Sequence, residues 1–264
     1  DLEKAVTNDF RLTVFDRQQI SYLEIVAKKT GKKPKVHLKI ETGLNRLGLE
    51  PEEAKKIVKN LPWVITLEGV MTHLASSDEN HQYTKLQLKQ FGDFGRALGA
   101  NTPKVLKHAF NSGAIFSDAK NTFDLVRPGI ALFGYLATKA QADLKPALGW
   151  KSRIISVKTV KKGEKLGYGL THMLKQNSKI AVVAVGYAEG YDRGLSNKSQ
   201  MLVAGARCPV VGRIAMSMTM IDVTNVPADP PTGGLEIGKE VVVIGPQGKD
   251  EITALELARL IDTN

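Results

Sequence analysis

Short apolar runs and amphipathic segments alternate along the first half of the chain. Apolar runs bounded by turn residues predict strands, and apolar residues three and four positions apart predict helices. Strands are expected at residues 12–15, 36–40, 67–74, 105–110 and 123–134, the last broken at Pro128-Gly129. Helical patterns begin near Ile20, Pro51 and Tyr83. Steps of roughly 30 residues are typical of parallel βα units.

The second half has a different pattern, in which short strands separated by glycine turns replace the helices. Strands are expected at residues 153–160, 180–185, 200–204, 208–211, 216–223 and 240–244. This spacing indicates an all-β barrel or sandwich. Within it, the alternation of Met216, Met218 and Met220 predicts core side chains. A helix returns only at the end, where Thr253 and Glu256 form a capping box.

A loosened pattern around residues 137–150, which include Pro146, predicts a linker between the halves. The domains are therefore expected at residues 1–138 and 139–264. The first half yields about five strands, whereas a closed (β/α) barrel needs eight. Two explanations stay open: an open sheet, or a barrel whose start lies outside these residues.

The composition is that of a globular protein, with 42% hydrophobic and 24% charged residues among 264. No apolar run approaches the roughly 18–20 residues of a membrane helix, and no signal-peptide pattern is visible. Cys208 is the only cysteine, which excludes a disulfide within the chain and fits a cytoplasmic location. The net charge of +10 comes from scattered lysines without interleaved aromatic platforms, so we expect no nucleic-acid partner.

Polar side chains gather at the predicted strand ends of the first half. In a (β/α) barrel the active site lies at the carboxyl ends of the strands, and several strands contribute to it. Glycine also lets backbone N–H groups approach a phosphate closely, as Ser112-Gly113 and Pro128-Gly129-Ile130 could. The residues at these ends are Lys39, Arg46, His73, His108, Asn111, Ser112, Arg127 and Gly129.

A tyrosine follows the apolar run 180–185 on a polar loop rich in glycine. Gly186, Tyr187 and Gly190 stand beside charged residues at this point. A rigid strand could here present the phenol of Tyr187 to a ligand. The alternative is an ordinary turn with a half-buried tyrosine, and local sequence does not decide between them.

Taken together, six segments resemble alanine racemase, a family of fold-type III enzymes that use pyridoxal 5'-phosphate (PLP). The segments are VHLKIETGLNRLG (36–48), EGVMTHLASSDE (68–79), HAFNSG (108–113), FDLVRPGIALFGY (123–135), AVGYAEGYDRG (184–194) and PVVGRIAMSMTMIDVT (209–224). The resemblance implies an α/β plus all-β fold, with a partial TIM (β/α) barrel followed by a C-terminal β domain. It also implies racemisation of L-alanine to D-alanine for peptidoglycan synthesis.

The resemblance also implies a role for each candidate residue. Tyr187 would be the catalytic acid/base, and Arg127 would hydrogen-bond the pyridine nitrogen of PLP. Arg46 and Met216 would contact the substrate, and Lys39 matches a lysine that is often carbamylated. The remaining cofactor-binding residues would be His73, His108, Asn111, Ser112, Gly129 and Ile130. No metal is expected.

The family's assembly and chemistry are implied in the same way. The family forms a head-to-tail homodimer in which Tyr187 would serve the partner subunit's cofactor. A phenol is a weak base at neutral pH, and neighbouring Arg and His side chains would favour the phenolate. Arginine does not give up its proton readily, so the ring nitrogen would stay unprotonated.

The sequence departs from the family in several places. No stretch like KANAYGHG, which carries the family's Schiff-base lysine and second base, occurs in these residues, and Ala215 and Ser217 stand where Cys and Asp are usual. We therefore expect a fragment of a racemase that is inactive alone and binds PLP weakly. A non-catalytic remnant that dimerises or binds the cofactor is the alternative.

Overall fold

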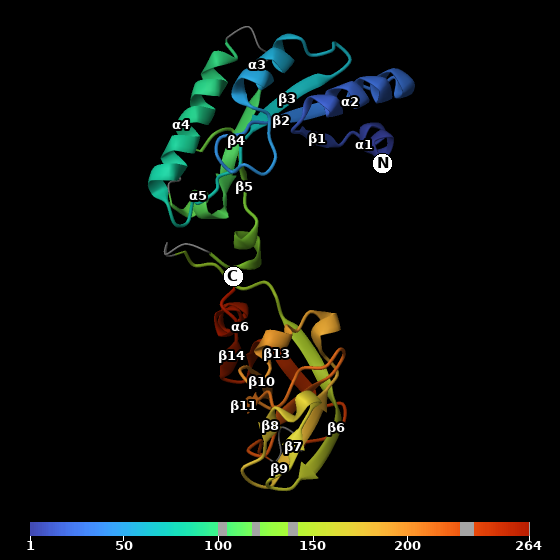
Figure 1. Ribbon diagram of the computed structural model, residues 1–264, viewed down its shortest axis with the longest axis vertical. Coiled ribbons are helices and arrows are strands. Elements are labelled where there is room, and N and C mark those ends of the chain that lie inside the picture. The colour runs from blue at the N-terminus through green and yellow to red at the C-terminus, as the bar shows by residue number, and fades with distance from the viewer. Residues whose placement is uncertain (100–104, 118–121, 137–141, 228–234, 264) are drawn as a thin grey trace. The chain divides into compact units, whose positions relative to one another are not determined.

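The computed structural model describes residues 1–99, 105–117, 122–136, 142–227 and 235–263. The chain forms two compact units, Asp1–Lys145 and Pro146–Asn264, which are the blue-to-green and the yellow-to-red parts of Figure 1. The predicted boundary between residues 138 and 139 falls outside the described residues.

The first unit contains a five-stranded parallel sheet in which each strand pairs with the next along the chain. All five predicted strands are present, but the fifth covers only three residues because Pro128 has no N–H to donate to a ladder. The part of that prediction beyond Pro128 is wrong, since Ile130–Phe133 is a 3-10 helix. The order is sequential from β1 to β5. The strands are β1 (Arg11–Val14), β2 (Lys35–Lys39), β3 (Thr66–Met71), β4 (Leu106–Asn111) and β5 (Leu125–Arg127).

Helices α2 and α4 lie against this sheet, as Figure 1 shows. Leu23 of α2 and Phe91 of α4 share a buried cluster with the strand residues Leu38 and Val70, and all four are almost fully buried. This burial is the main stabilising contribution of the amphipathic helices. The helices of the unit are α1 (Leu2–Thr7), α2 (Arg17–Thr30), α3 (Pro51–Lys59), α4 (His81–Ala97) and α5 (Ser112–Ser117).

The second unit is built around a seven-stranded sheet with antiparallel pairing. Its order is β11-β10-β13-β6-β9-β12, and β14 pairs with β13. The strands are β6 (Trp150–Val160), β9 (Ser178–Val183), β10 (Gln200–Val203), β11 (Ala206–Pro209), β12 (Thr219–Asp222), β13 (Glu240–Gln247) and β14 (Asp250–Ile252). The unit also contains the ribbon of β7 (Lys165–Leu166) and β8 (His172–Met173) and the helix α6 (Ala254–Leu260). Short 3-10 helices lie at Tyr168–Leu170, Tyr187–Glu189 and Arg193–Leu195.

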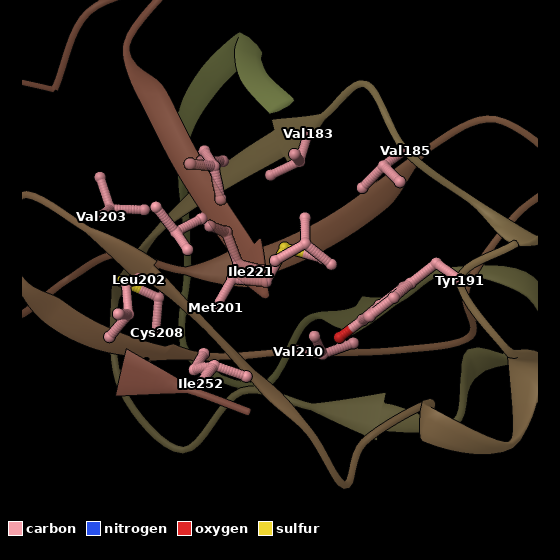
Figure 2. Close-up of a cluster of buried hydrophobic side chains, with 14 of the residues drawn as sticks. Val183, Val185, Tyr191, Met201, Leu202, Val203, Cys208, Val210, Ile221 and Ile252 are labelled. Atoms are coloured by element: carbon pink, nitrogen blue, oxygen red, sulfur yellow. The ribbon is translucent and has the colours of Figure 1, made fainter. Parts of the chain in front are cut away.

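Inward-facing side chains of these strands form the core of the second unit (Figure 2). Val183, Met201, Cys208 and Ile221 come from four strands and are almost fully buried. Tyr191, which follows β9, inserts its ring into the same cluster. The core therefore fixes the loop after β9 as well as the sheet.

The prediction that the methionines at positions 216 and 218 are core residues is wrong. Their side chains are 61% and 45% exposed. The strand predicted from residue 216 begins only at Thr219, because the chain first leaves the sheet at Gly212, whose φ of +79° lies in the left-handed region. The alternation of methionines therefore does not lie in a strand. Among the described residues, no helix has the length and apolar character needed to cross a membrane.

Candidate active site

The polar residues predicted at the strand ends of the first unit lie along one edge of the sheet. Lys39, Asn111 and Arg127 are the last residues of β2, β4 and β5, and His73 follows the end of β3. Because the strands are parallel, their carboxyl ends lie together at this edge. It is the edge where (β/α) proteins place their active sites.

The guanidinium of Arg127 is held by three acceptors inside the unit. Nη1 donates to Nδ1 of His108 at 2.5 Å, and Nη2 donates to the carbonyls of Thr72 at 2.7 Å and Ala109 at 3.2 Å. Within the described residues these bonds use only the two terminal nitrogens, so the Nε–H stays free to donate to a ligand. Burial lowers the pKa of Arg127 from its usual value, but an arginine remains protonated in any such setting.

Hydrogen-bond donors also converge where β4 and β5 end. The N–H groups of Gly129 and Ala131 donate to Oγ of Ser112 at 2.8 and 3.3 Å, and Ser112 itself is buried. A methyl group on Gly129 would meet nothing within 4 Å, so the space above its backbone is open. Ile130 follows in the same turn and is exposed. Ser112 is the acceptor of both N–H groups in this structure, and an anion bound here would take its place as their acceptor.

Positive charge is concentrated at this edge. Burial, followed by the charge of Arg46, lowers the pKa of Lys39, which is 7% exposed. Burial and then the charges of Arg127, Arg46 and Lys39 lower the pKa of His73. These shifts place four basic groups within electrostatic reach of one another, an arrangement that favours an anionic ligand and a neutral His73.

Two predicted residues make hydrogen bonds that hold neighbouring groups of the first unit. Oδ1 of Asn111 accepts from the N–H of Ala114 at 3.1 Å and from the hydroxyl of Ser77 at 2.7 Å, and thereby caps the start of α5. His108 is buried and bonds to Arg127 through its ring. Both side chains fix their neighbours in place.

A buried amide that the sequence analysis did not single out holds two loops of the site. Nε2 of Gln87, on α4, lies 3.2 Å from both Oγ1 of Thr42 and the carbonyl of His73, and its Oε1 accepts from the N–H of Ala75 at 2.9 Å. The hydroxyls of Thr42 and Thr72 are 2.6 Å apart. The available signal in the sequence was a glutamine at helical spacing from Phe91 and Phe94, which places its amide on the buried face of α4. A buried amide needs hydrogen-bond partners, which here are the two loops of the site.

Tyr187 and Met216 belong to the second unit, where backbone hydrogen bonds join their loops. The N–H of Tyr187 donates to the carbonyl of Ala215 at 3.1 Å, and the N–H of Ala188 donates to that of Met216 at 2.8 Å. The phenol of Tyr187 is 47% exposed. The ring is therefore half-buried, with a surface that a ligand can reach from solvent.

Comparisons with known proteins match both units. The family description "Alanine racemase, N-terminal domain" matches residues 1–137, and "Alanine racemase, C-terminal domain" matches residues 147–264. Alanine racemase of Symbiobacterium thermophilum is 39% identical over 99% of this chain, and that of Halothermothrix orenii is 42% identical over 87%. This chain spans 70% and 61% of the lengths of those two relatives.

Solved structures agree with these matches. Alanine racemase from Streptomyces lavendulae has a TM-score of 0.89 and 30% identity, and covers 99% of this chain and 70% of its own. The enzyme from Bartonella henselae, solved with covalently bound pyridoxal phosphate, has a TM-score of 0.81 and 27% identity, over 99% of this chain and 70% of its own. The predicted architecture, part of a (β/α) barrel followed by a β domain, is confirmed. The chain belongs to the alanine racemase family, whose members are PLP-dependent isomerases that interconvert L- and D-alanine.

Proposed function

We propose that the protein containing this chain racemises alanine with PLP held at the strand-end edge of the first unit. The observation that carries the proposal is the fixed guanidinium of Arg127 beside the donors of Ser112 and Gly129. The first suits an acceptor nitrogen of a ring, and the second suits a phosphate. Together they match the two ends of pyridoxal phosphate.

The residues present fit this cofactor. The Nε–H of Arg127 would donate to the pyridine nitrogen, and Arg127 would keep its own protons. Ser112, Gly129 and Ile130 would donate to the phosphate, for which the backbone of Gly129 is open. When bound, the cofactor withdraws electrons from the α-carbon of the amino acid and makes its α-proton acidic.

The proton transfer is assigned to residues of this chain as follows. Tyr187 would take or return the α-proton at its phenolic oxygen on the L-alanine face. Burial and then its basic neighbours lower the pKa of His73, and this neutral ring would form hydrogen bonds between the phenol and the surrounding polar groups. Arg46 and the backbone of Met216 would bind the substrate carboxylate. The positive charge at the strand-end edge favours both the phenolate of Tyr187 and the substrate carboxylate.

Lys39 is proposed to carry a carbamate. A buried amine with a lowered pKa has a larger neutral fraction at pH 7, and the neutral amine is the form that attacks carbon dioxide. The carbamate would add a negative charge beside Arg46 and orient it. Native mass spectrometry with added bicarbonate should detect one carbon dioxide adduct, which Lys39→Arg should remove.

Tyr187 lies in the second unit, and we propose that a head-to-tail homodimer brings it to the partner subunit's cofactor. Mixing an inactive Tyr187→Phe protein with an inactive Arg127→Ala protein tests this arrangement. In a mixed dimer one of the two sites would have both residues intact. Partial recovery of activity supports the dimer, and no recovery despite subunit exchange contradicts it.

The proposed activity is tested by D-alanine formation from L-alanine in the complete protein with added PLP. Tyr187→Phe should lower kcat by about 10²–10⁴-fold, the usual contribution of a general acid/base, and should leave PLP binding intact. Tyr168→Phe is the control, because its ring is also exposed and belongs to the same unit. Wild-type protein that binds PLP and dimerises but forms no D-alanine would favour the non-catalytic alternative.

A further inference from the structure

A line of ionic and hydrogen-bonded side chains runs from the site edge to the far side of the sheet. Arg127 contacts His108 at 2.5 Å, and Nε2 of His108 lies 2.7 Å from Nδ1 of His37. Nε2 of His37 lies 3.5 Å from the carboxylate of Glu68, which also accepts from Arg11 at 3.0 Å. Both histidines are buried, so water does not replace these contacts.

The chemistry of the two ends fixes the direction of every bond between them. Arg127 can only donate, so Nδ1 of His108 must be the unprotonated, accepting nitrogen. The proton of a neutral His108 is then on Nε2 and is donated to Nδ1 of His37. The proton of His37 is in turn on Nε2 and faces the carboxylate of Glu68, which can only accept. A single tautomer of each histidine, protonated at Nε2, therefore satisfies every contact from Arg127 to Glu68.

The backbone is shaped to allow this line. The register between β2 and β3 shifts so that Glu68 is an extra residue between the pairs Val36↔Leu67 and His37↔Gly69. A bulge of this kind re-aims a side chain, here that of Glu68 towards His37. A methyl group on Gly69 would lie 2.3 Å from Nδ1 of His37, so only glycine leaves room for the imidazole at this position.

The electrostatics agree with a neutral His108 beside the charged Arg127. Burial, and then the charges of Arg127 and His37, lower the pKa of His108 to about 4. Burial raises the pKa of Glu68, but the hydrogen bond and charge of Arg11 and the hydrogen bond of His37 outweigh it and leave that pKa below its usual value. At neutral pH the line therefore runs from the cation Arg127 through a neutral His108 ring, and on through the hydrogen-bonded ring of His37 to the anion Glu68.

We propose that Glu68 and His37 are positioning residues that set the tautomer of His108 and thereby lock the guanidinium of Arg127 in the orientation that meets the ligand. The inference rests on the proposed function only for the identity of that ligand. Neither side chain lies at the strand-end edge, so both act through His108.

The direct test observes the proton positions in the cofactor-free complete protein labelled with [¹⁵N]histidine. Long-range ¹H–¹⁵N spectra distinguish a protonated from an unprotonated ring nitrogen. We expect His108 and His37 to be unprotonated at Nδ1 and protonated at Nε2, with assignments from His37→Asn and His108→Asn. A protonated Nδ1 on His108 at neutral pH would overturn the proposal.

Substitutions at Glu68 provide the functional test. Glu68→Leu removes the acceptor and should mix the tautomers of His37 and His108, shift the absorbance of bound PLP and lower kcat about five- to tenfold with KM for alanine little changed. Glu68→Gln keeps an accepting oxygen and should restore the tautomers and most of kcat. Asp9→Asn is the control, since Asp9 contacts the same Arg11 at 3.4 Å outside the line.

A second variant keeps the test decisive if Glu68→Leu does not fold. Gly69→Ala changes no titratable side chain, but its methyl group displaces the ring of His37, so it should reproduce the tautomer change and the loss of kcat. Unchanged tautomers in both variants would refute the line. Correct tautomers in a protein without racemase activity would retain the line and reject the proposed function.

Discussion

Gly186 lies where the loop carrying Tyr187 meets the loop carrying Met216, and replacing it with alanine perturbs that contact alone. An added methyl carbon would lie 2.2 Å from the carbonyl oxygen of Ala215 and 2.4 Å from that of Met216. The φ of Gly186 is −149°, which any residue adopts, so the substitution introduces a steric clash and no dihedral strain.

The magnitude follows from what those carbonyls do. Ordinary contact begins near 3.4 Å, so the loop at Ala215 must retreat by about 1 Å. The same two carbonyls accept the N–H groups of Tyr187 and Ala188 at 3.1 and 2.8 Å, and the retreat breaks both bonds. Two lost hydrogen bonds at about 1 kcal/mol each, with local repacking, give a destabilisation of about 2–4 kcal/mol.

Tryptophan fluorescence during urea unfolding of the 264-residue chain measures this loss. Trp150 packs edge-on to Tyr191 with ring centroids 5.9 Å apart and reports on the second unit, whereas Trp63 is 80% exposed and changes little on unfolding. Gly149→Ala is the matched control, because a methyl group there meets nothing within 4 Å. Its stability should equal that of the parent or exceed it by up to about 1 kcal/mol.

The same substitution should lower the racemase activity of the complete protein, because it moves Tyr187 relative to Met216. Gly186→Ala protein within about 0.5 kcal/mol of the parent in unfolding free energy would show that the loops are not in the close contact described. Full kcat in that protein would also contradict the assigned role of the loop.

Three further outcomes are expected. Burial raises the pKa of Cys208 to about 12, so at pH 8 about one thiol in ten thousand is ionised, and a thiol reagent should label it only after unfolding; fast labelling of native protein would contradict this. Tyr191→Phe removes the 2.7 Å bond to Ser199 and should cost about 1 kcal/mol in urea unfolding, whereas Tyr187→Phe should cost activity but not stability; equal losses of stability would refute the distinction. Arg207→Met should destabilise the second unit at pH 7 and much less near about pH 2, because the hydrogen bond from Arg207 lowers the pKa of Asp250. The Asp250 carboxylate stabilises the fold above its unfolded pKa of 3.8, and this contribution disappears as the pH falls through the lower pKa of the folded state. A destabilisation that does not depend on pH would assign the effect to packing.

The sequence predicted the five strands of the first unit and six strands of the second, because their apolar runs and turn residues follow simple periodicities; the short strands β7, β8 and β14 were not predicted. It also placed Lys39, Asn111 and Arg127 correctly at strand ends. It could not predict the hydrogen-bond partners of His108 or Asn111, because these depend on which side chain a neighbouring segment brings within reach. His37 and Glu68 were missed for the same reason: their pairing depends on a register shift between β2 and β3 that no local pattern reveals.

The methionine pattern failed for a complementary reason. Alternation predicts a buried face only where the chain is in a sheet, and the turn at Gly212 takes Met216 and Met218 out of it. A glycine in a left-handed conformation is not distinguishable by sequence alone from one in an ordinary turn. Tertiary structure decides such positions.

The strand orders of the two units imply that their sheets form at different stages of synthesis on the ribosome. In the first unit each strand pairs with the one made just before it, so the sheet can grow as the chain emerges. In the second unit the central strand β6 pairs with β13, and Arg153 lies opposite Glu240 near the end of the chain. Strands β1 to β5 can therefore be paired before β13, the partner of β6, has been synthesised. Nascent chains of this protein should need protection from aggregation mainly during synthesis of the second unit.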